Sequence, residues 1–236
     1  ADAPGFAVRD DSELSIAGLQ NKLLVVSQPD GTWARPVNGH PSTHIIKLDD
    51  PRRPGVIAAE HACLLIARRI ALTSVQAVHT DIDGMAALIV DRYDRAVHDA
   101  GRPIRLHQED TCQALGIDID AAGGRGKYEQ FGGPSYRSIA RLLDRHADAP
   151  DEQLVQLLRI ATFTAVIGNA DADGKNISVL IDTTTGAIRL APLYDTVPTA
   201  LWPSLRTTSA MAVGGRFAAL PTVSDLMAEA HSWGLA

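Results

Sequence analysis

Apolar and polar positions change their period along the chain, and this change divides it into two parts. Up to about residue 95, short apolar runs between turn residues predict strands at residues 23–27, 32–35, 43–48 and 85–90. Residues 29–31 (Pro-Asp-Gly) predict the turn between the first two strands. A helical pattern interrupts the strands at residues 56–71. The first part therefore predicts a small sheet that carries one helix.

Beyond residue 95 the periodicity is mainly helical. Helices are predicted at residues 108–115, 135–146, 151–167 and 224–233, with Ser135 as an N-cap. Residues 151–167 are apolar almost all round, which is typical of a helix buried in a core. Residues 177–181 and 187–190 predict a hairpin, and the Gly-rich residues 121–126 predict a mobile loop. We expect an α+β fold with domains at residues 1–95 and 96–236.

Composition and charge exclude several classes of protein. With 236 residues, of which 45% are hydrophobic and 21% charged, the chain is typical of a soluble globular protein. A net charge of −6 gives no general attraction to nucleic acid, although it does not exclude a local basic patch. Cys63 and Cys112 lie far apart in apolar runs, which argues against a zinc site or a disulfide scaffold. No apolar run spans a bilayer and no signal-peptide pattern is present, so we expect a cytoplasmic protein.

The most informative polar cluster is residues 171–176 (Asp-Ala-Asp-Gly-Lys-Asn), which Asp195 follows downstream. Kinases use an Asp and an Asn at this spacing, with a later Asp, to accept a hydroxyl proton and to bind Mg²⁺. In isolation such a run is more typical of a solvated turn. A calcium-binding loop does not fit, because Lys175 stands where a third oxygen ligand belongs.

Other segments would complete a phosphotransferase site. Lys47, at the end of a strand, suits the nucleotide phosphates, and Glu60 on the next helix can pair with it. A solvent-exposed strand lysine and a surface glutamate are the alternatives. Residues 15–22 can form a phosphate-cradling loop, and residues 91–95 fall where a hinge to the adenine, or a plain linker, would lie. The order of these segments predicts a bilobed protein-kinase-like fold, with a small β-rich N-lobe and a mainly helical C-lobe.

Taken together, these segments resemble the HipA-like serine/threonine kinases, the toxin half of bacterial toxin–antitoxin modules. The resemblance runs through nearly the whole chain. It rests on residues 15–18 with Gln20 and Lys22, and on residues 43–48, 91–95, 105–110, 112–116, 127–129, 132–135, 167–171, 175–176, 193–195 and 211–215. It implies ATP and Mg²⁺ as cofactors, Asp171 as the catalytic residue, and Asn176 and Asp195 as the metal ligands.

The resemblance also implies the residues of the nucleotide site. Lys47 would contact the phosphates, and the backbone of Asp91 and Tyr93 would meet the adenine. Ser15 would be autophosphorylated, which shuts the kinase down because the added negative charge repels the ATP phosphates. The implied nucleotide-binding set is Ser15, Ala17, Gly18, Lys47, Asp91, Tyr93, Asp94 and Gln108.

The partners implied by the resemblance are a protein substrate, such as an aminoacyl-tRNA synthetase, and a small helix-turn-helix antitoxin. Nucleic acid would be reached only through that antitoxin, and no membrane partner is expected. Family members usually extend further at both ends, so we expect a truncated or domain-length chain. A small-molecule kinase and a non-catalytic nucleotide-binding module that acts with the antitoxin remain as alternatives.

Three positions depart from the usual pattern of the family. Asp173 stands where the loop usually carries a His, and a second acid there can add a metal contact or perturb Asp171 by like-charge repulsion. Asn21 and Asp91 stand where Glu is frequent. A backbone contact at Asp91 would tolerate that change.

Overall fold

The computed structural model describes residues 22–97, 103–218 and 220–235. The expected phosphate-cradling residues Ser15, Ala17 and Gly18 therefore lie outside the described residues, as does Asn21. Among the described residues no helix is both long and apolar enough to cross a membrane.

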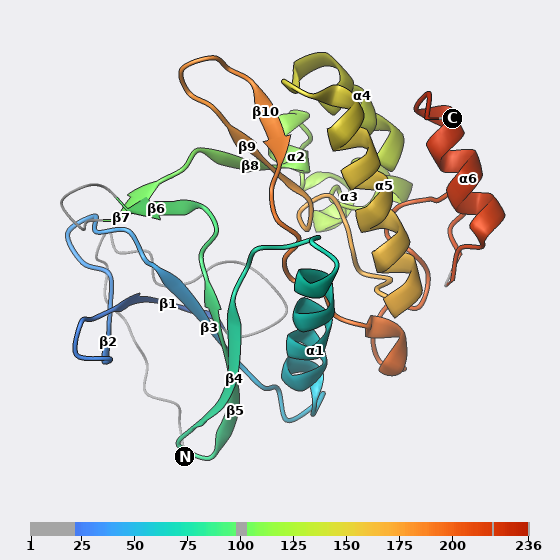
Figure 1. Ribbon diagram of the computed structural model, residues 1–236. Helices are drawn as coiled ribbons and strands as arrows, with labels where there is room; N and C mark the ends of the chain where they lie inside the picture. Colours follow the sequence, from blue (N-terminus) through green and yellow to red (C-terminus); the bar gives the residue numbers. More distant parts are fainter. Residues whose placement is uncertain (1–21, 98–102, 219, 236) are drawn as a thin grey trace.

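The first part of the chain forms a five-stranded antiparallel sheet in the order β2-β1-β3-β5-β4 (Figure 1). Its strands are β1 (Lys22–Ser27), β2 (Trp33–Ala34), β3 (His44–Leu48), β4 (Ala77–Ile82) and β5 (Met85–Asp91). Four of them confirm the expected strands. Lys22 of β1 lies opposite Lys47 of β3, and directly opposed residues share one face of a sheet.

Strand β4 was not anticipated from the sequence. It pairs along its whole length with β5, and the two are joined by Asp83 and Gly84, which both have positive φ values of 51° and 81°. An Asp-Gly pair in this conformation forms the tight turn that hairpins favour. The turn signal was therefore present, but the strand before it carries exposed side chains such as Val78, and its apolar pattern is weak.

Helix α1 (Val56–Arg69) confirms the predicted helix and packs between the sheet and the helical part. Ile57 and Leu64 on one side contact the sheet core with Leu88. Cys63 and Ala67 instead join the core of the helical part. One helix thus holds both parts of the molecule together, and Figure 1 shows it beside β4 and β5.

The helical part is built on α4 (Tyr136–His146), α5 (Pro150–Ile167) and α6 (Val223–Ser232), as expected. Ser135 caps α4 by accepting a hydrogen bond from the backbone of Ser138 at 3.0 Å, which confirms the predicted N-cap. The expectation that α5 is buried all round was wrong. Val155 and Val166 are 47% and 76% exposed, because α4 and α6 cover only part of its circumference.

A three-stranded sheet, in the order β10-β9-β8, lies beside these helices. The predicted hairpin is β9 (Ser178–Ile181) with β10 (Ile188–Leu190). The predicted helix at residues 108–115 was wrong in its first half. Residues 108–110 form β8 (Gln108–Asp110), paired with β9, and the helix α2 (Thr111–Ala114) begins only after Asp110. Asp110 and Gln113 form a reciprocal capping box, which sets this boundary.

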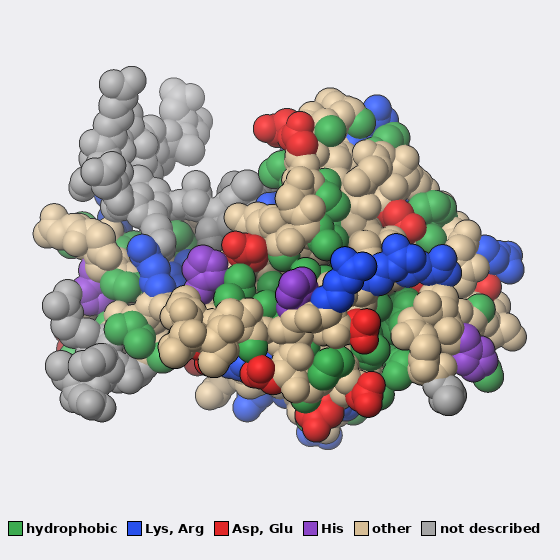
Figure 2. Space-filling view, turned by 90° about the horizontal axis from the view of Figure 1, so that it is seen from above, with side chains coloured by type: hydrophobic (Ala, Val, Ile, Leu, Met, Phe, Trp, Pro, Cys, Tyr) green, Lys and Arg blue, Asp and Glu red, His purple; other side chains and the backbone are tan. Residues whose placement is uncertain are grey.

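Short elements fill the connections. They are β6 (Arg95–Val97) paired with β7 (Pro103–Arg105), α3 (Ala121–Gly124) in the predicted Gly-rich loop, and the 3₁₀ turns Glu129–Phe131 and Thr199–Leu201. Figure 2 shows a row of Lys and Arg side chains across one face of the molecule, with scattered acidic side chains. The net negative charge of the chain therefore coexists with a local basic row.

Candidate active site

One cavity of about 540 Å³ collects the chemistry that the sequence singled out. It lies where β1, β3, α1 and the β5–β6 connection meet the loop after α5 and the segment after β10. All described residues of the expected site line it: Lys47, Asp91, Tyr93, Asp94, Gln108, Asp171, Asn176 and Asp195. Residues far apart in the sequence, such as Lys47 and Asp195, which are 148 positions apart, therefore converge on one space.

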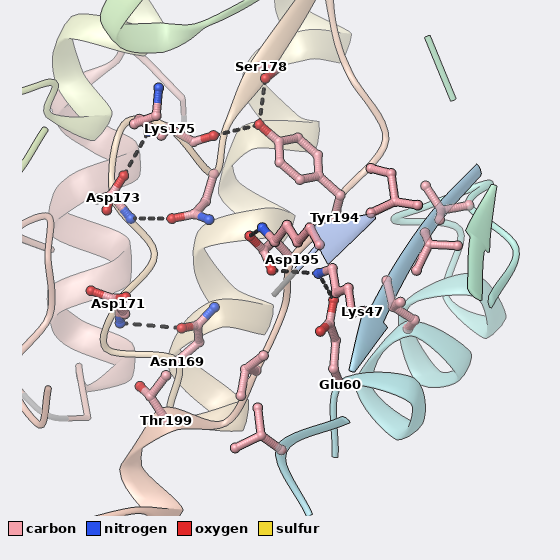
Figure 3. A pocket seen from close by; sticks show the side chains of 18 of the residues that line it. Lys47, Glu60, Asn169, Asp171, Asp173, Lys175, Ser178, Tyr194, Asp195 and Thr199 are labelled. Carbon is pink, nitrogen blue, oxygen red and sulfur yellow. Dashed lines mark hydrogen bonds and ion pairs between the residues drawn. The ribbon is translucent and has the colours of Figure 1, made fainter. Parts of the chain in front are cut away.

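The loop between α5 and β9 presents Asp171 to the cavity (Figure 3). Helix α5 ends at Ile167, and the next residue, Gly168, has a φ of 71°, the left-handed conformation that glycine adopts readily. The backbone amide of Asp171 then donates to Asn169 Oδ1 at 3.3 Å, and the Tyr128 hydroxyl donates to Asp171 Oδ1 at 3.0 Å. The carboxyl group of Asp171 is therefore held at one oxygen.

Asp173 has a different environment from Asp171, although they are two residues apart. Its side chain is 1% exposed and forms an ion pair with Lys127 at 2.7 Å, while Oδ1 accepts the backbone amide of Lys175 at 2.8 Å. Burial raises the pKa of the Asp173 carboxyl, and Lys127 partly offsets this effect. The Asp173 amide donates to Asn176 Oδ1 at 3.0 Å. Asp173 thus orders the loop from within.

Lys47 is buried and confirms the predicted pairing with Glu60, to which its ammonium donates a hydrogen bond. The same ammonium donates to Asp195 Oδ1 at 2.7 Å. Lys22 donates to the other oxygen of Asp195 at 3.1 Å. Two lysines from neighbouring strands therefore bind the carboxylate of Asp195, which lies in the segment after β10.

These contacts shift the pKa of each group in a direction that follows from its partners. Burial alone would lower the pKa of Lys47, but the charges of Asp195 and Glu60 outweigh it and raise that pKa. For the carboxyl group of Glu60 burial acts in the opposite direction and raises the pKa, and Glu60 Oε2 has no hydrogen-bond partner among the described residues. Burial would also raise the pKa of Asp195, yet Lys47 and Lys22 hold it well below its usual range. Asp195 is thus an anion at neutral pH.

Another part of the cavity lining is aromatic and apolar. Tyr93 stacks on Tyr194 with ring centroids 5.4 Å apart, and its hydroxyl donates to Gln108 Oε1 at 2.6 Å. Burial raises the pKa of Tyr93 to about 12, so the hydroxyl stays protonated. Apolar side chains extend this surface: Ile45, Val56, Leu64, Val75 and Val90. Such a surface can accept a flat aromatic ring.

The segment between β5 and β6 also lines the cavity. The Asp91 carboxylate lies 3.0 Å from His44 Nε2, and the Asp91 amide donates to the carbonyl of Gln76 at 2.9 Å. Asp94 accepts two hydrogen bonds from the Arg92 guanidinium, at 2.9 and 2.7 Å, and one from Arg95 at 2.7 Å. In this structure the Asp94 carboxylate therefore holds the β5–β6 segment in place through Arg92 and Arg95.

The contacts of several cavity residues were not anticipated from the sequence. Lys22 was anticipated only as the last residue of the expected phosphate-cradling loop, and Lys127 and Tyr128 only as parts of a family motif. Tyr194 was not anticipated either, although its hydroxyl lies 2.6 Å from both Ser178 Oγ and the Lys175 carbonyl. The Lys175 ammonium donates to Asp110 at 2.8 Å. Only Lys22 carried a usable signal, because it stands at the start of an apolar strand.

Comparison with known proteins places the chain in a kinase-containing family. The HipA-like C-terminal domain family matches residues 14–234. A putative kinase, Y4mE, of Sinorhizobium fredii is 38% identical over 213 residues, which cover 90% of this chain and 49% of the relative. The serine/threonine-protein kinase toxin HipA of Shewanella oneidensis is 28% identical over 217 residues, with coverages of 86% and 47%. The chain thus spans about half the length of these relatives.

Solved structures agree with this assignment. The chain is similar to HipA in the Shewanella oneidensis complex of HipA, HipB and operator DNA, with a TM-score of 0.82 and 25% identity. That match covers 99% of this chain and 55% of HipA. The Helicobacter pylori proinflammatory kinase CtkA shares the fold at a TM-score of 0.53 and 11% identity, over 84% of this chain and 62% of CtkA. The chain therefore belongs to the HipA-like C-terminal domain family.

Proposed function

We propose that this chain is the ATP- and Mg²⁺-dependent catalytic part of a HipA-like serine/threonine protein kinase that acts as a growth-inhibiting toxin. The observation that carries the proposal is the convergence of Asp171, Asn176, Asp195 and the Lys47–Glu60 pair on one cavity. Family membership and the named kinases among the relatives support it.

The residues of the cavity suit a nucleotide with Mg²⁺. Carboxylate and amide oxygens are the donors that Mg²⁺ prefers, usually one or two carboxylates together with substrate phosphates. Asn176 and Asp195 supply such oxygens. Lys22 and Lys47 already gather two positive charges on Asp195, which is the charge that a divalent cation would bring. Bound Mg²⁺ would offset the negative charge of the phosphates.

In this proposal each side chain has a separate task. Asp171 orients the acceptor hydroxyl and takes its proton, while Lys47, positioned by Glu60, contacts the nucleotide phosphates. The adenine lies on the Tyr93 side, against the backbone of residues 91–93 and near Asp94 and Gln108. From the family resemblance, Ser15, Ala17 and Gly18 would contact the nucleotide phosphates, and Ser15 would be the autophosphorylation site. Positioning and electrostatics supply most of the rate enhancement.

The same proposal assigns the two parts of the molecule to two lobes. Residues 1–95 would form the β-rich N-lobe, residues 96–236 the helical C-lobe, and the nucleotide would bind between them. This assignment is supported by the contributions to the cavity, since Lys47 and Glu60 come from the first part, whereas Asp171 and Asp195 come from the second.

The proposed partners follow from the family. The Shewanella HipA was solved with HipB and operator DNA. We assign to this chain a helix-turn-helix antitoxin, through which it would reach nucleic acid, and a protein substrate of the aminoacyl-tRNA synthetase class. The cytoplasm is the proposed location.

The variant Asp171→Asn tests the proposal. We expect at least about 100-fold less ATP-dependent phosphorylation of protein, because the asparagine cannot take the hydroxyl proton. Binding of Mg²⁺–ATP, measured by calorimetry, is expected to persist. The matched control is Asp144→Asn, since Asp144 is an exposed aspartate of α4 outside the cavity.

Two measurements on the parent protein separate the alternatives. Mg²⁺–ATP binding without transfer to any acceptor would identify a nucleotide-binding module. Transfer to small molecules but not to protein would identify a small-molecule kinase. Equal phosphorylation and equal growth arrest by the parent and Asp171→Asn would refute the role of Asp171.

A further inference from the structure

Residues 127–129 (Lys-Tyr-Glu) form a continuous segment that contacts the loop between α5 and β9 at three points; this loop carries the proposed catalytic Asp171 and is called the catalytic loop below. The Tyr128 hydroxyl donates to Asp171, the Lys127 ammonium pairs with Asp173, and the Lys127 carbonyl accepts the backbone amide of Gly174 at 3.2 Å. The two segments are more than 40 residues apart in sequence. None of the roles proposed so far uses this segment.

The ring of Tyr128 is held so that its hydroxyl has little freedom. The ammonium of Lys127 lies 4.8 Å from the ring centroid, and the guanidinium of Arg206 lies 4.7 Å from it. Arg206 is tied down in turn by hydrogen bonds to the carbonyls of Thr208 and Ser209, at 2.6 and 3.2 Å. Two cation–π contacts on one ring therefore fix the donor of the Asp171 hydrogen bond.

The Lys127–Asp173 pair fixes the other side of the loop. Asp173 is almost fully buried, so loss of its partner would leave a buried charge uncompensated, which is strongly unfavourable. Burial alone would lower the pKa of Lys127, but Asp173 raises it above its usual range. The acid that departs from the family pattern is therefore neutralised by Lys127 and held in a structural role.

Glu129 anchors the segment to the rest of the molecule. Its Oε2 accepts the backbone amide of Ala212 at 2.6 Å, and its own amide donates to the Ala210 carbonyl at 3.2 Å. The backbone of Gly133 also packs closely against this segment, since a Cβ at Gly133 would lie 2.6 Å from the carbonyl carbon of Lys127. The segment is therefore held in place at Glu129 as well as at Lys127 and Tyr128.

We propose that residues 127–129 are a brace that orients the catalytic loop, with Tyr128 as the positioning residue for the Asp171 carboxylate. The brace holds Oδ1 of Asp171 and leaves Oδ2, which makes no hydrogen bond to a described residue, for the acceptor hydroxyl. This inference rests on the catalytic role proposed for Asp171. Lys127 keeps Asp173 out of the reaction, and Glu129 holds the brace in place.

Kinetics of Tyr128→Phe test the positioning role. Loss of the hydroxyl frees the Asp171 carboxylate to rotate, and small displacements of reacting groups carry large rate penalties. We expect kcat to fall about tenfold or more while the KM for ATP stays within about twofold, since the nucleotide site is untouched. The matched control is Tyr136→Phe, which removes a hydroxyl from a buried tyrosine of the helical core, outside the cavity. An unchanged kcat in Tyr128→Phe would overturn the inference.

Hydrogen exchange tests the brace without reference to activity. In Tyr128→Phe and Lys127→Met, amides of residues 169–176 are expected to exchange at least about threefold faster, whereas those of the β1–β5 sheet are unchanged. Adding Asp173→Asn to Lys127→Met removes the uncompensated charge and is expected to restore part of the protection. Unchanged exchange in the loop would overturn the inference. Absence of phosphoryl transfer by the parent would instead refute the proposed function, and exchange would then decide the brace alone.

Discussion

Individual carboxylates in this molecule differ in behaviour because their partners differ. Asp195 has a φ of 50° and receives a lysine on each oxygen. Glu60, fully buried, shares Lys47 with it and has one oxygen without a partner among the described residues. Two cations and two anions thus form a compact network, in which the loss of any one member leaves a charge uncompensated.

Asp94 permits a direct test of such pairing. Burial would raise its pKa, but Arg92 and Arg95 lower it from the ordinary value of 3.8. A lowered pKa in the folded state stabilises the protein above the unfolded-state pKa, and this stabilisation is lost as the pH falls through the folded-state value. We therefore expect Asp94→Asn to reduce the free energy of unfolding by about 3 kcal/mol at neutral pH.

The difference between the parent and Asp94→Asn should shrink as the pH falls below 3.8. Urea unfolding at a series of pH values measures it. Asp144→Asn serves as the control, because this exposed side chain should show a small difference at every pH. A parent–variant difference that stays constant down to the acid limit would contradict the assigned ion pairs.

At the scale of elements, the loop between α5 and β9 packs against Pro134 and Cys112 and is also contacted by residues 127–129. Gly174 lies against Pro134 and Cys112, and its carbonyl accepts the Thr111 hydroxyl at 2.6 Å. A Cβ at Gly174 would lie 2.4 Å from Pro134 Cγ and 2.8 Å from Cys112 Sγ. The loop therefore cannot accept a side chain there without moving.

Gly174→Ala is expected to lower the free energy of unfolding by about 1–3 kcal/mol through overpacking. It should also lower phosphoryl transfer, because displacement of the loop moves Asp171. Thermal unfolding and the kinase assay measure the two effects. The control is Gly84→Asn, where nothing lies within 4 Å of an added Cβ and asparagine tolerates the left-handed backbone. Full stability and activity in Gly174→Ala would show that the packing is looser than described.

Elements that are determined by nearby residues could be predicted from the sequence, whereas elements that depend on pairing with distant residues could not. Helices α4, α5 and α6 were predicted because periodicity and caps act within a few residues. Strand β8 was taken for the start of a helix, since its pairing with β9 joins residues about 70 apart. Strand β4 was missed because its identity depends on β5 more than on its own exposed side chains.

At the scale of the whole molecule, the cavity depends on the meeting of two parts of the fold. Lys22 and Lys47 reach across it from the sheet to Asp195, and α1 packs into the cores of both parts. A ligand that binds there contacts both parts and stabilises the folded state by mass action.

Mg²⁺–ATP at about 100 times its Kd is therefore expected to add about 2.7 kcal/mol to the free energy of unfolding. Differential scanning fluorimetry should detect this as a rise in Tm that is larger than the rise with ATP and EDTA. In Asp195→Asn the two rises should be equal, because the carboxylate that would hold Mg²⁺ is gone. A Tm that ignores Mg²⁺–ATP in the parent would argue against the proposed site.

Most residues of the candidate site could be predicted from short motifs in the sequence. The spacing of Asp171 and Asn176, the strand position of Lys47 and the order of motifs along the chain all act over short stretches, so the sequence alone identified the family and eight residues that share the cavity. The partners of those residues depended on the folded chain. Lys22 and Asp195 are separated by 173 positions and Tyr128 and Asp171 by 43, and no local pattern specifies which distant side chains will meet.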